Sequence, residues 1–170
     1  MGISELIPCP QCSQKISPRA KACPRCGHPL KPYWGFEWKS RASLGGWPLV
    51  HVAVGRDKTT GKILVARGMI AVGQFAIGVI TIAQFGIGFL FGFGQFILGY
   101  TALAQFAFAF YFGIGQIATG QTAIGQLAIG QYVLGQIGLG RFVWDTKGRH
   151  PMAEEYFRTL WLSVKSLLIP

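Results

Sequence analysis

A five-residue repeat of small residues between Gly68 and Gly140 constrains the fold more than any other feature of this chain. Small residues recur every fifth position, with a one-residue shift after residue 88 and a second after residue 109. At a longer scale, segment 73–93 aligns with segment 94–114 and with the segment that begins at Gly115, which gives a period of 21 residues. Self-similarity at a fixed period is the sequence signature of a repeat architecture.

An α-helix does not explain this repeat, because five residues advance a helix by about 140° beyond a full turn. The small positions would then scatter around the helix. A coil with four five-residue sides explains it better, since twenty residues return the chain to its start about 4.8 Å higher. The two 21-residue intervals then carry one extra corner residue each. The sequence therefore predicts a mainly β fold, with a β-solenoid of 20–21 residues per coil over residues 68–143.

Glutamines recur in two series along the repeat. The first series is Gln74, Gln95, Gln116 and Gln136, and the second, half a unit away, is Gln84, Gln105 and Gln126. Equivalent glutamines stack in a coil of this kind, so that their side-chain amides can hydrogen-bond from layer to layer. We therefore expect two structural glutamine ladders on opposite sides of the coil.

Two triplets, Gly73-Gln74-Phe75 and Ala104-Gln105-Phe106, resemble those of the pentapeptide-repeat quadrilateral β-helix. In that family a small residue two positions before the central leucine or phenylalanine points inward. The resemblance implies a four-sided coil. Here glutamine replaces the usual Asn or Asp, and outward positions such as Ile77 and Ile129 are apolar. An apolar exterior has to be covered, so we expect a homo-oligomer or a membrane association.

The same segment also fits a multi-pass α-helical membrane region. Residues Met69–Gly140 form a stretch of 72 without a charged side chain, and about 20 residues suffice for one span. Nine glutamines within the stretch and the lack of polar loops between the spans argue against membrane helices. The solenoid is therefore the preferred interpretation and the membrane region is the alternative.

The four cysteines form two pairs at the amino-terminal end, in Cys9-Pro-Gln-Cys12 and Cys23-Pro-Arg-Cys26. Each pair can place two thiolates on one side of a tight turn, and four thiolates suit a tetrahedral Zn²⁺ ion. A segment of about thirty residues has too small a core to fold without such support. Over residues 7–30 the sequence resembles the short zinc ribbons at the start of many bacterial proteins, which implies the metal but no particular function. We expect residues 1–30 to form a zinc ribbon.

Charge is confined to the two ends of the chain. The net charge is +10, residues 1–67 hold eleven basic and three acidic side chains, and none lies between Arg67 and Arg141. A basic ribbon favours a nucleic-acid or protein partner of opposite charge, although it also serves solubility. Cysteines gathered in a metal motif indicate a reducing cytoplasm for the ribbon. The repeat region is then cytoplasmic or membrane-associated.

Three further segments complete the predicted organisation. Residues 31–48 form a linker rich in aromatic and basic side chains, and residues 49–67 form a β-hairpin or a first solenoid turn. Residues 151–169 form an amphipathic helix, with Pro151 at its first position. That helix either caps the last coil or lies at a membrane interface.

Groups able to catalyse a reaction are scarce in this chain. It has six carboxylates and three histidines, none of them paired at a spacing diagnostic of a catalytic site. The sequence therefore predicts no enzyme, no catalytic residue and no small-molecule substrate. It indicates a structural or interaction protein, a zinc ribbon on a self-associating or membrane-associated solenoid. The alternative is a small integral membrane protein whose cytoplasmic ribbon recruits a protein or nucleic acid.

Overall fold

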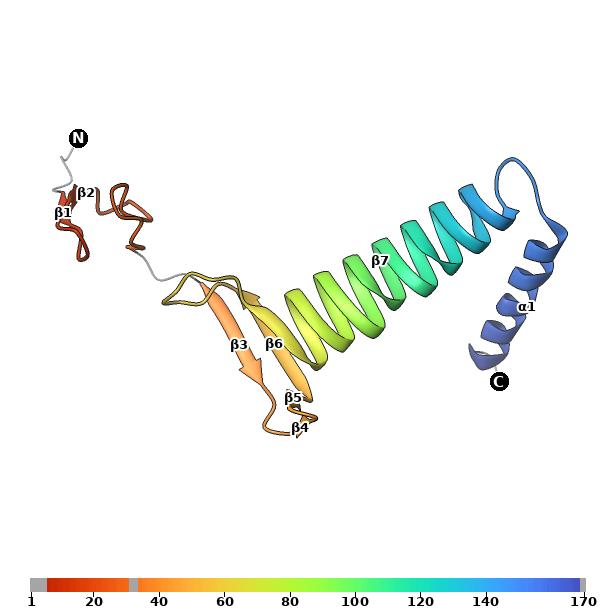
Figure 1. The fold of residues 1–170 in the computed structure, drawn as a ribbon, viewed down its shortest axis with the longest axis horizontal. Coiled ribbons are helices and arrows are strands. Elements are labelled where there is room, and N and C mark those ends of the chain that lie inside the picture. Colours follow the sequence, from red (N-terminus) through yellow and green to blue (C-terminus); the bar gives the residue numbers. More distant parts are fainter. Residues whose placement is uncertain (1–5, 31–33, 169–170) are drawn as a thin grey trace. The chain divides into compact units, whose positions relative to one another are not determined.

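The structure, a computed structural model, describes residues 6–30 and 34–168. In this part the fold is mainly β, with one α-helix at the carboxyl-terminal end (Figure 1). The chain divides into two compact units. The first comprises Met1–Phe36 with Gly55–Leu64, and the second comprises Glu37–Val54 with Val65–Pro170.

The first unit contains short antiparallel pairings. Strands β1 (Ile7–Pro8) and β2 (Lys15–Ile16) pair with Ile7 opposite Ile16. An isolated bridge joins Ala22 to Pro29, and another joins Arg56 to Ile63. The loop from Gly55 to Leu64 is thus a small turn with its own closing contacts.

The second unit is built on one very long strand. Strand β7 (Val65–Trp144) has 80 residues and is wound into successive turns (Figure 1). Strand β6 (Val50–Gly55) pairs in parallel with the first turn, with Val50 opposite Ile70. Strand β3 (Gly35–Lys39) lies on the other side of β6. Strands β4 (Ser43–Leu44) and β5 (Trp47–Pro48) form a separate antiparallel pair.

Contacts within β7 show that one turn takes ten or eleven residues. The hydroxyl of Thr119 donates to the carbonyl oxygen of Ala109 at 3.3 Å, and other contacts join residues with the same spacing. The ring centroids of Phe75 and Phe85 lie 5.5 Å apart, and those of Phe85 and Phe96 lie 6.0 Å apart. The expected 20–21 residues per coil were therefore wrong by a factor of two. The 21-residue period of the sequence corresponds to one turn of ten residues followed by one of eleven.

A row of small side chains, here called the inward row, forms the core of β7. Its members are spaced five residues apart, with two steps of six where the eleven-residue turns occur. Because a turn takes about ten residues, each turn contributes two members, one from each of two five-residue arms. The buried members are Ala66, Ala71, Ala76, Thr81, Gly92, Ile97, Ala102, Ala107, Gly113, Ala118, Ala123, Ala128 and Val133. The inward row is mostly alanine and glycine because the core is thin, although Ile97 and Val133 are also fully buried in it.

Glycine is required where a bend passes close over the turn below it. A Cβ atom added to Gly78 would lie 2.6 Å from the carbonyl oxygen of Gly68, ten residues earlier. A Cβ atom added to Gly125 would likewise collide with the carbonyl oxygen of Gly115. These glycines belong to the five-residue repeat between Gly68 and Gly140, which lies two positions after the inward row. Close approach of two backbones therefore explains why that repeat is so often glycine.

A buried histidine joins β3, β6 and β7 at the first turn. His51 is 3% exposed, and its Nδ1 accepts the backbone N–H of Arg67 at 2.7 Å. Its Nε2 lies 3.2 Å from a carboxylate oxygen of Glu37, which also pairs with Lys39 at 2.8 Å. The hydrogen bond from Lys39 is the main cause that lowers the pKa of Glu37, and His51 adds to it. These contacts fix the start of the coil and indicate a packed histidine.

Helix α1 (Pro151–Leu168) packs its first half against the last turns of β7. Ala153 and Phe157 are buried. The hydroxyl groups of Tyr156 and Thr122 are hydrogen-bonded at 2.7 Å, and the ring of Tyr156 stacks on Tyr132 with centroids 4.1 Å apart. The helix begins at Pro151, as the sequence predicts, because proline suits the first helical position.

The alternative of membrane-spanning helices finds no support in this fold. Residues 69–140 all lie in strand β7. Among the described residues, no helix combines the length and the apolarity that a membrane crossing demands.

Candidate metal centre and coil surface

The two cysteine pairs are held by equivalent turns. In the first turn the N–H of Ser13 donates to the carbonyl oxygen of Cys9, and in the second the N–H of Gly27 donates to that of Cys23, each at 2.9 Å. Ser13 and Gly27 both have a positive φ, 58° and 73°. Each chain reversal thus depends on a left-handed residue directly after the second cysteine of the pair.

These turns bring the four thiol sulfurs of Cys9, Cys12, Cys23 and Cys26 together, all within 4.8 Å of one another. The Sγ atoms of Cys9 and Cys26 are 3.7 Å apart, and those of Cys12 and Cys23 are 3.6 Å apart. A tetrahedral ion with metal–sulfur bonds of about 2.3 Å requires sulfurs about 3.8 Å apart. Disulfide sulfurs lie about 2.05 Å apart. The geometry therefore suits a metal ion, and these cysteines are free thiols.

Within this group of four sulfurs, the pKa values of Cys23 and Cys26 are shifted in opposite directions. The backbone N–H of Cys26 is the main cause that lowers the pKa of Cys23, to about 6. At Cys26 the backbone N–H of His28 favours the thiolate, but burial and the three neighbouring sulfurs together raise the pKa to about 12. Four thiolates so close together repel one another, and a divalent cation removes that repulsion.

The core around the cysteines is very small. It consists of Cys9, Cys23 and Ile16, with Cys12 and Leu30 packed against them. So few buried side chains cannot offset the conformational entropy lost on folding. A bound metal would supply the missing stabilisation.

The surface of the ribbon is basic, as the sequence predicts. Lys15, Arg19, Lys21 and Arg25 are all exposed. His28 lies outside the four-sulfur group, and its carbonyl oxygen accepts the backbone N–H of Cys23 at 2.9 Å. An anionic protein or nucleic acid as the partner of this surface stays a prediction.

The seven glutamines of the two predicted series form one column along the coil, whereas Gln121 and Gln131 lie apart from it, with Nε2 of Gln121 donating to Oε1 of Gln131 at 3.4 Å. Gln74, Gln84 and Gln95 line one shallow groove, and Gln116, Gln126 and Gln136 line another. Each groove thus mixes members of both predicted series, and Gln105 falls between them in the same spacing. The expectation of two series on opposite sides was wrong, because a ten-residue turn places both above one another. Hydrogen bonding between these amides stays a prediction.

The other outward columns of the first turns are apolar. One consists of Phe75, Phe85, Phe96 and Phe106, here called the phenylalanine column, with successive ring centroids 5.5–6.1 Å apart. Beside it, Ile77, Ile87 and Leu98 follow the same spacing, and Ile87 and Leu98 are exposed. Phe110, in a further column, is 80% exposed. The described part of the coil therefore exposes to solvent an apolar surface of the kind normally found in a protein core.

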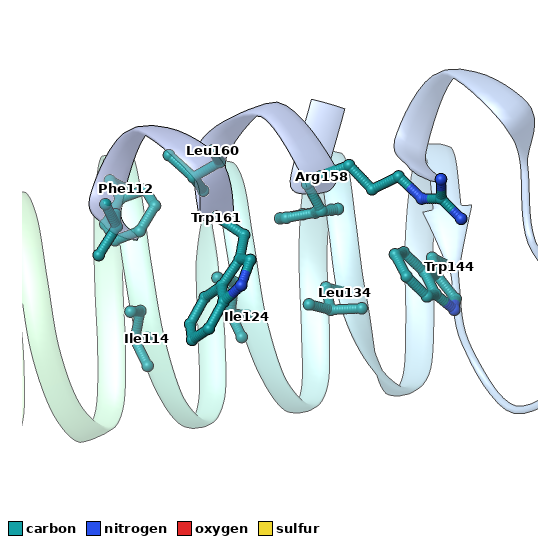
Figure 2. Close-up of a pocket in the computed structure, with 10 residues that line it drawn as sticks. Phe112, Ile114, Ile124, Leu134, Trp144, Arg158, Leu160 and Trp161 are labelled. Carbon is teal, nitrogen blue, oxygen red and sulfur yellow. The ribbon is translucent and has the colours of Figure 1, made fainter. Parts of the chain in front are cut away.

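Helix α1 and the coil enclose an apolar groove of about 490 Å³ (Figure 2). The coil contributes a column of Ile114, Ile124, Leu134 and Trp144, and the helix contributes Leu160 and Trp161. Arg158, which also lines the groove, pairs with Glu154 at 2.9 Å. The first half of α1 thus lies on the coil, whereas its second half stands off from it.

Comparisons with known proteins return nothing: no family model, no curated protein and no solved structure matches this chain. The sequence pattern identified the four cysteines, but it missed the left-handed position of Ser13. The signal was present, since Ser13 and Gly27 occupy the same place after Cys-x-x-Cys.

Proposed function

We propose that this chain is a non-enzymatic interaction protein, in which a zinc ribbon is joined to an apolar β-solenoid that associates with lipid or with further copies of itself. The observation that carries the proposal is the coil surface. Charged side chains are missing between Arg67 and Arg141, and apolar columns face outward there. Such a surface is stable in water only when it is covered.

The metal of the ribbon is zinc in this proposal. Four cysteine sulfurs with tetrahedral spacing are the donor set of structural Zn²⁺ sites, which hold no open position for a substrate. The ribbon would fold in a reducing compartment such as the cytoplasm, where thiols persist. Its exposed basic side chains then offer a docking surface for an acidic protein or a nucleic acid.

The coil is best described as a narrow β-solenoid with two five-residue arms per turn. Support comes from the ten- and eleven-residue contacts of β7 and from the inward row of small residues. The repeat therefore supplies an elongated apolar surface, and not a site for chemistry. Aspartate, glutamate, lysine, arginine, histidine and cysteine do not occur from residue 68 to residue 140.

The state of the purified full-length protein tests this function. Prepared without detergent and with zinc present, the protein should sediment only as oligomers or together with lipid. Mild detergent should release a monomer with a β-type circular dichroism spectrum. A stable monomer in detergent-free buffer would contradict the proposal, because its apolar surface would then be uncovered.

A further inference from the structure

Building on the proposed function, we infer that the partner of the coil is the hydrocarbon interior of a lipid bilayer, which β7 crosses with its axis along the membrane normal. The inference rests on the distribution of apolar side chains, the position of the charges and the length of the uncharged part. All three are properties of the second unit.

The apolar side chains surround the coil, which favours lipid over a second copy. In the first turns the phenylalanine column is one of several apolar columns. Another column consists of Val79, Phe89, Tyr100 and Phe110. Gln74, Gln84, Gln95 and Gln105 supply the one continuous polar line over these turns. A subunit interface covers one face of a molecule, whereas lipid covers every side at once.

The length of the uncharged coil matches a bilayer. Residues Met69–Gly140 number 72, which makes about seven turns. With neighbouring strands about 4.8 Å apart, these turns extend roughly 34 Å along the axis. The hydrocarbon core of a bilayer is about 30 Å thick. Arg67 and Arg141 flank this length, so that each would lie among the lipid headgroups.

The backbone of a coil meets the main requirement for a position in lipid. Each turn of β7 pairs with the turns above and below it, so its N–H and C=O groups are satisfied within the strand. The first turn pairs with β6, and the N–H of His150 donates to the carbonyl oxygen of Val143 in the last turn at 2.9 Å. The amides of the glutamine column can donate to and accept from one another, which lowers the cost of removing them from water.

The carboxyl-terminal helix is compatible with this placement at the Arg141 end. Trp161 and Leu162 are exposed and would face lipid, while acyl chains fill the groove between α1 and the coil (Figure 2). Arg158 is paired with Glu154, which lowers the cost of bringing both charges close to lipid, and the long side chain of Lys165 can snorkel towards the headgroups. Trp38 and Trp47 accompany the other end, where tryptophan suits a membrane interface.

Trypsin provides a direct test, because the chain has lysine and arginine on both sides of the uncharged region and none within it. The zinc-loaded full-length protein is reconstituted into vesicles of neutral phosphatidylcholine and floated in 1 M salt, which suppresses electrostatic binding. We expect the protein to float. In intact vesicles trypsin should cut any one molecule at one end only, and detergent should then allow cutting at both ends.

A matched pair of variants within one column extends the test. Phe96 and Ile137 are 41% and 56% exposed, so neither Phe96→Lys nor Ile137→Lys buries a charge in the folded coil. We expect Phe96→Lys, near the bilayer centre, to reduce the floated fraction at least tenfold. Ile137→Lys, close to Arg141, should reduce it less than twofold. Circular dichroism in detergent verifies that both variants keep the β fold.

The possible outcomes separate this inference from the proposed function. Cutting of single molecules at both ends in intact vesicles, or equal effects of the two variants, would overturn the membrane crossing. An oligomer that does not float would also overturn it and leave the proposed function standing. A detergent-free monomer that does not float would overturn both.

Discussion

At the scale of single residues, the four cysteines are the groups on which the ribbon depends. Replacing one of them, as in Cys12→Ser, leaves three thiolates for a tetrahedral ion. We expect the wild-type protein to bind one zinc ion per chain, and Cys12→Ser to lose at least tenfold in zinc affinity. Competition with a chromophoric chelator measures the affinity. His28→Ala is the matched control and should keep the full affinity, since His28 lies outside the four-sulfur group.

Ser13 carries a backbone conformation that glycine adopts at lower cost. Its φ is 58°, in the left-handed region that costs about 1–2 kcal/mol for residues with a Cβ atom. Glycine also loses more conformational freedom on folding, at a cost of about 0.5–1 kcal/mol. We therefore expect Ser13→Gly to raise the zinc affinity of the ribbon about two- to fivefold, because folding and metal binding are coupled. Gly27→Ala should lower it similarly, since no other atom lies near its Cβ position. A loss of zinc affinity in Ser13→Gly, or a gain in Gly27→Ala, would contradict this account.

At the scale of structural elements, close glycine contacts set the path of β7. Gly125→Ala places a methyl group against the carbonyl oxygen of Gly115, so the two turns must move apart. We expect a loss of about 1–3 kcal/mol in the free energy of unfolding, measured by denaturant titration in detergent. Gly148→Ala, in the loop after β7, meets no atom within 4 Å and should change stability by less than about 0.5 kcal/mol.

The contact between α1 and β7 includes one buried hydrogen bond. Tyr156→Phe removes the partner of the Thr122 hydroxyl, which is 2.7 Å away on a side chain that is 1% exposed. We expect a loss of about 1–3 kcal/mol in the free energy of unfolding, read from thermal unfolding. Adding Thr122→Val should restore part of it. Thr159→Ala, on the exposed side of α1, serves as the control, and an equal loss there would contradict the assignment.

The sequence predicted the elements better than it predicted how the strand winds. The five-residue repeat identified the length of the arms of the coil, and Pro151 marked the start of α1. The five-residue repeat could not tell two arms per turn from four, because an arm of five residues gives the same period in both. The expected inward position of Gly73 was also wrong, since Ala71 and Ala76 face inward instead. The shift in the 21-residue alignment could be explained by one extra corner residue in a long coil or by an eleven-residue turn in a short one. The pairing of Phe75 with Phe85 decides between them.

The candidate metal centre was predictable for a different reason. The two Cys-x-x-Cys pairs are local, and each fixes its own turn without help from the rest of the chain. The environment of His51 was not predictable in detail, since Glu37 and Arg67 reach it from other strands. Contacts between distant segments depend on how the strand winds, and the five-residue repeat did not determine the number of residues per turn.

At the scale of the whole molecule, the turn length predicts which deletions the coil tolerates. Removal of Gln95–Ala104 takes out ten residues and leaves Gly92 and Ala107 five positions apart, as the inward row requires. We expect this shortened protein to keep its β-type circular dichroism spectrum and a cooperative thermal transition. Removal of the seven residues Gln95–Thr101 breaks the spacing and should abolish both. A fold that survives the shorter deletion would refute the ten-residue turn.

A strand that pairs with itself has free edges only at its two ends, and this has a consequence for how the molecules assemble. At the last turn, the segment after β7 folds back, with Trp144 bridged to Arg149 and His150 bonded to Val143. At the first turn β6 and β3 extend the pairing, so an unprotected last turn could pair with the outer edge of β3 in another chain, and each addition would expose a new edge. This short closing loop is therefore a safeguard against head-to-tail polymerisation into fibres.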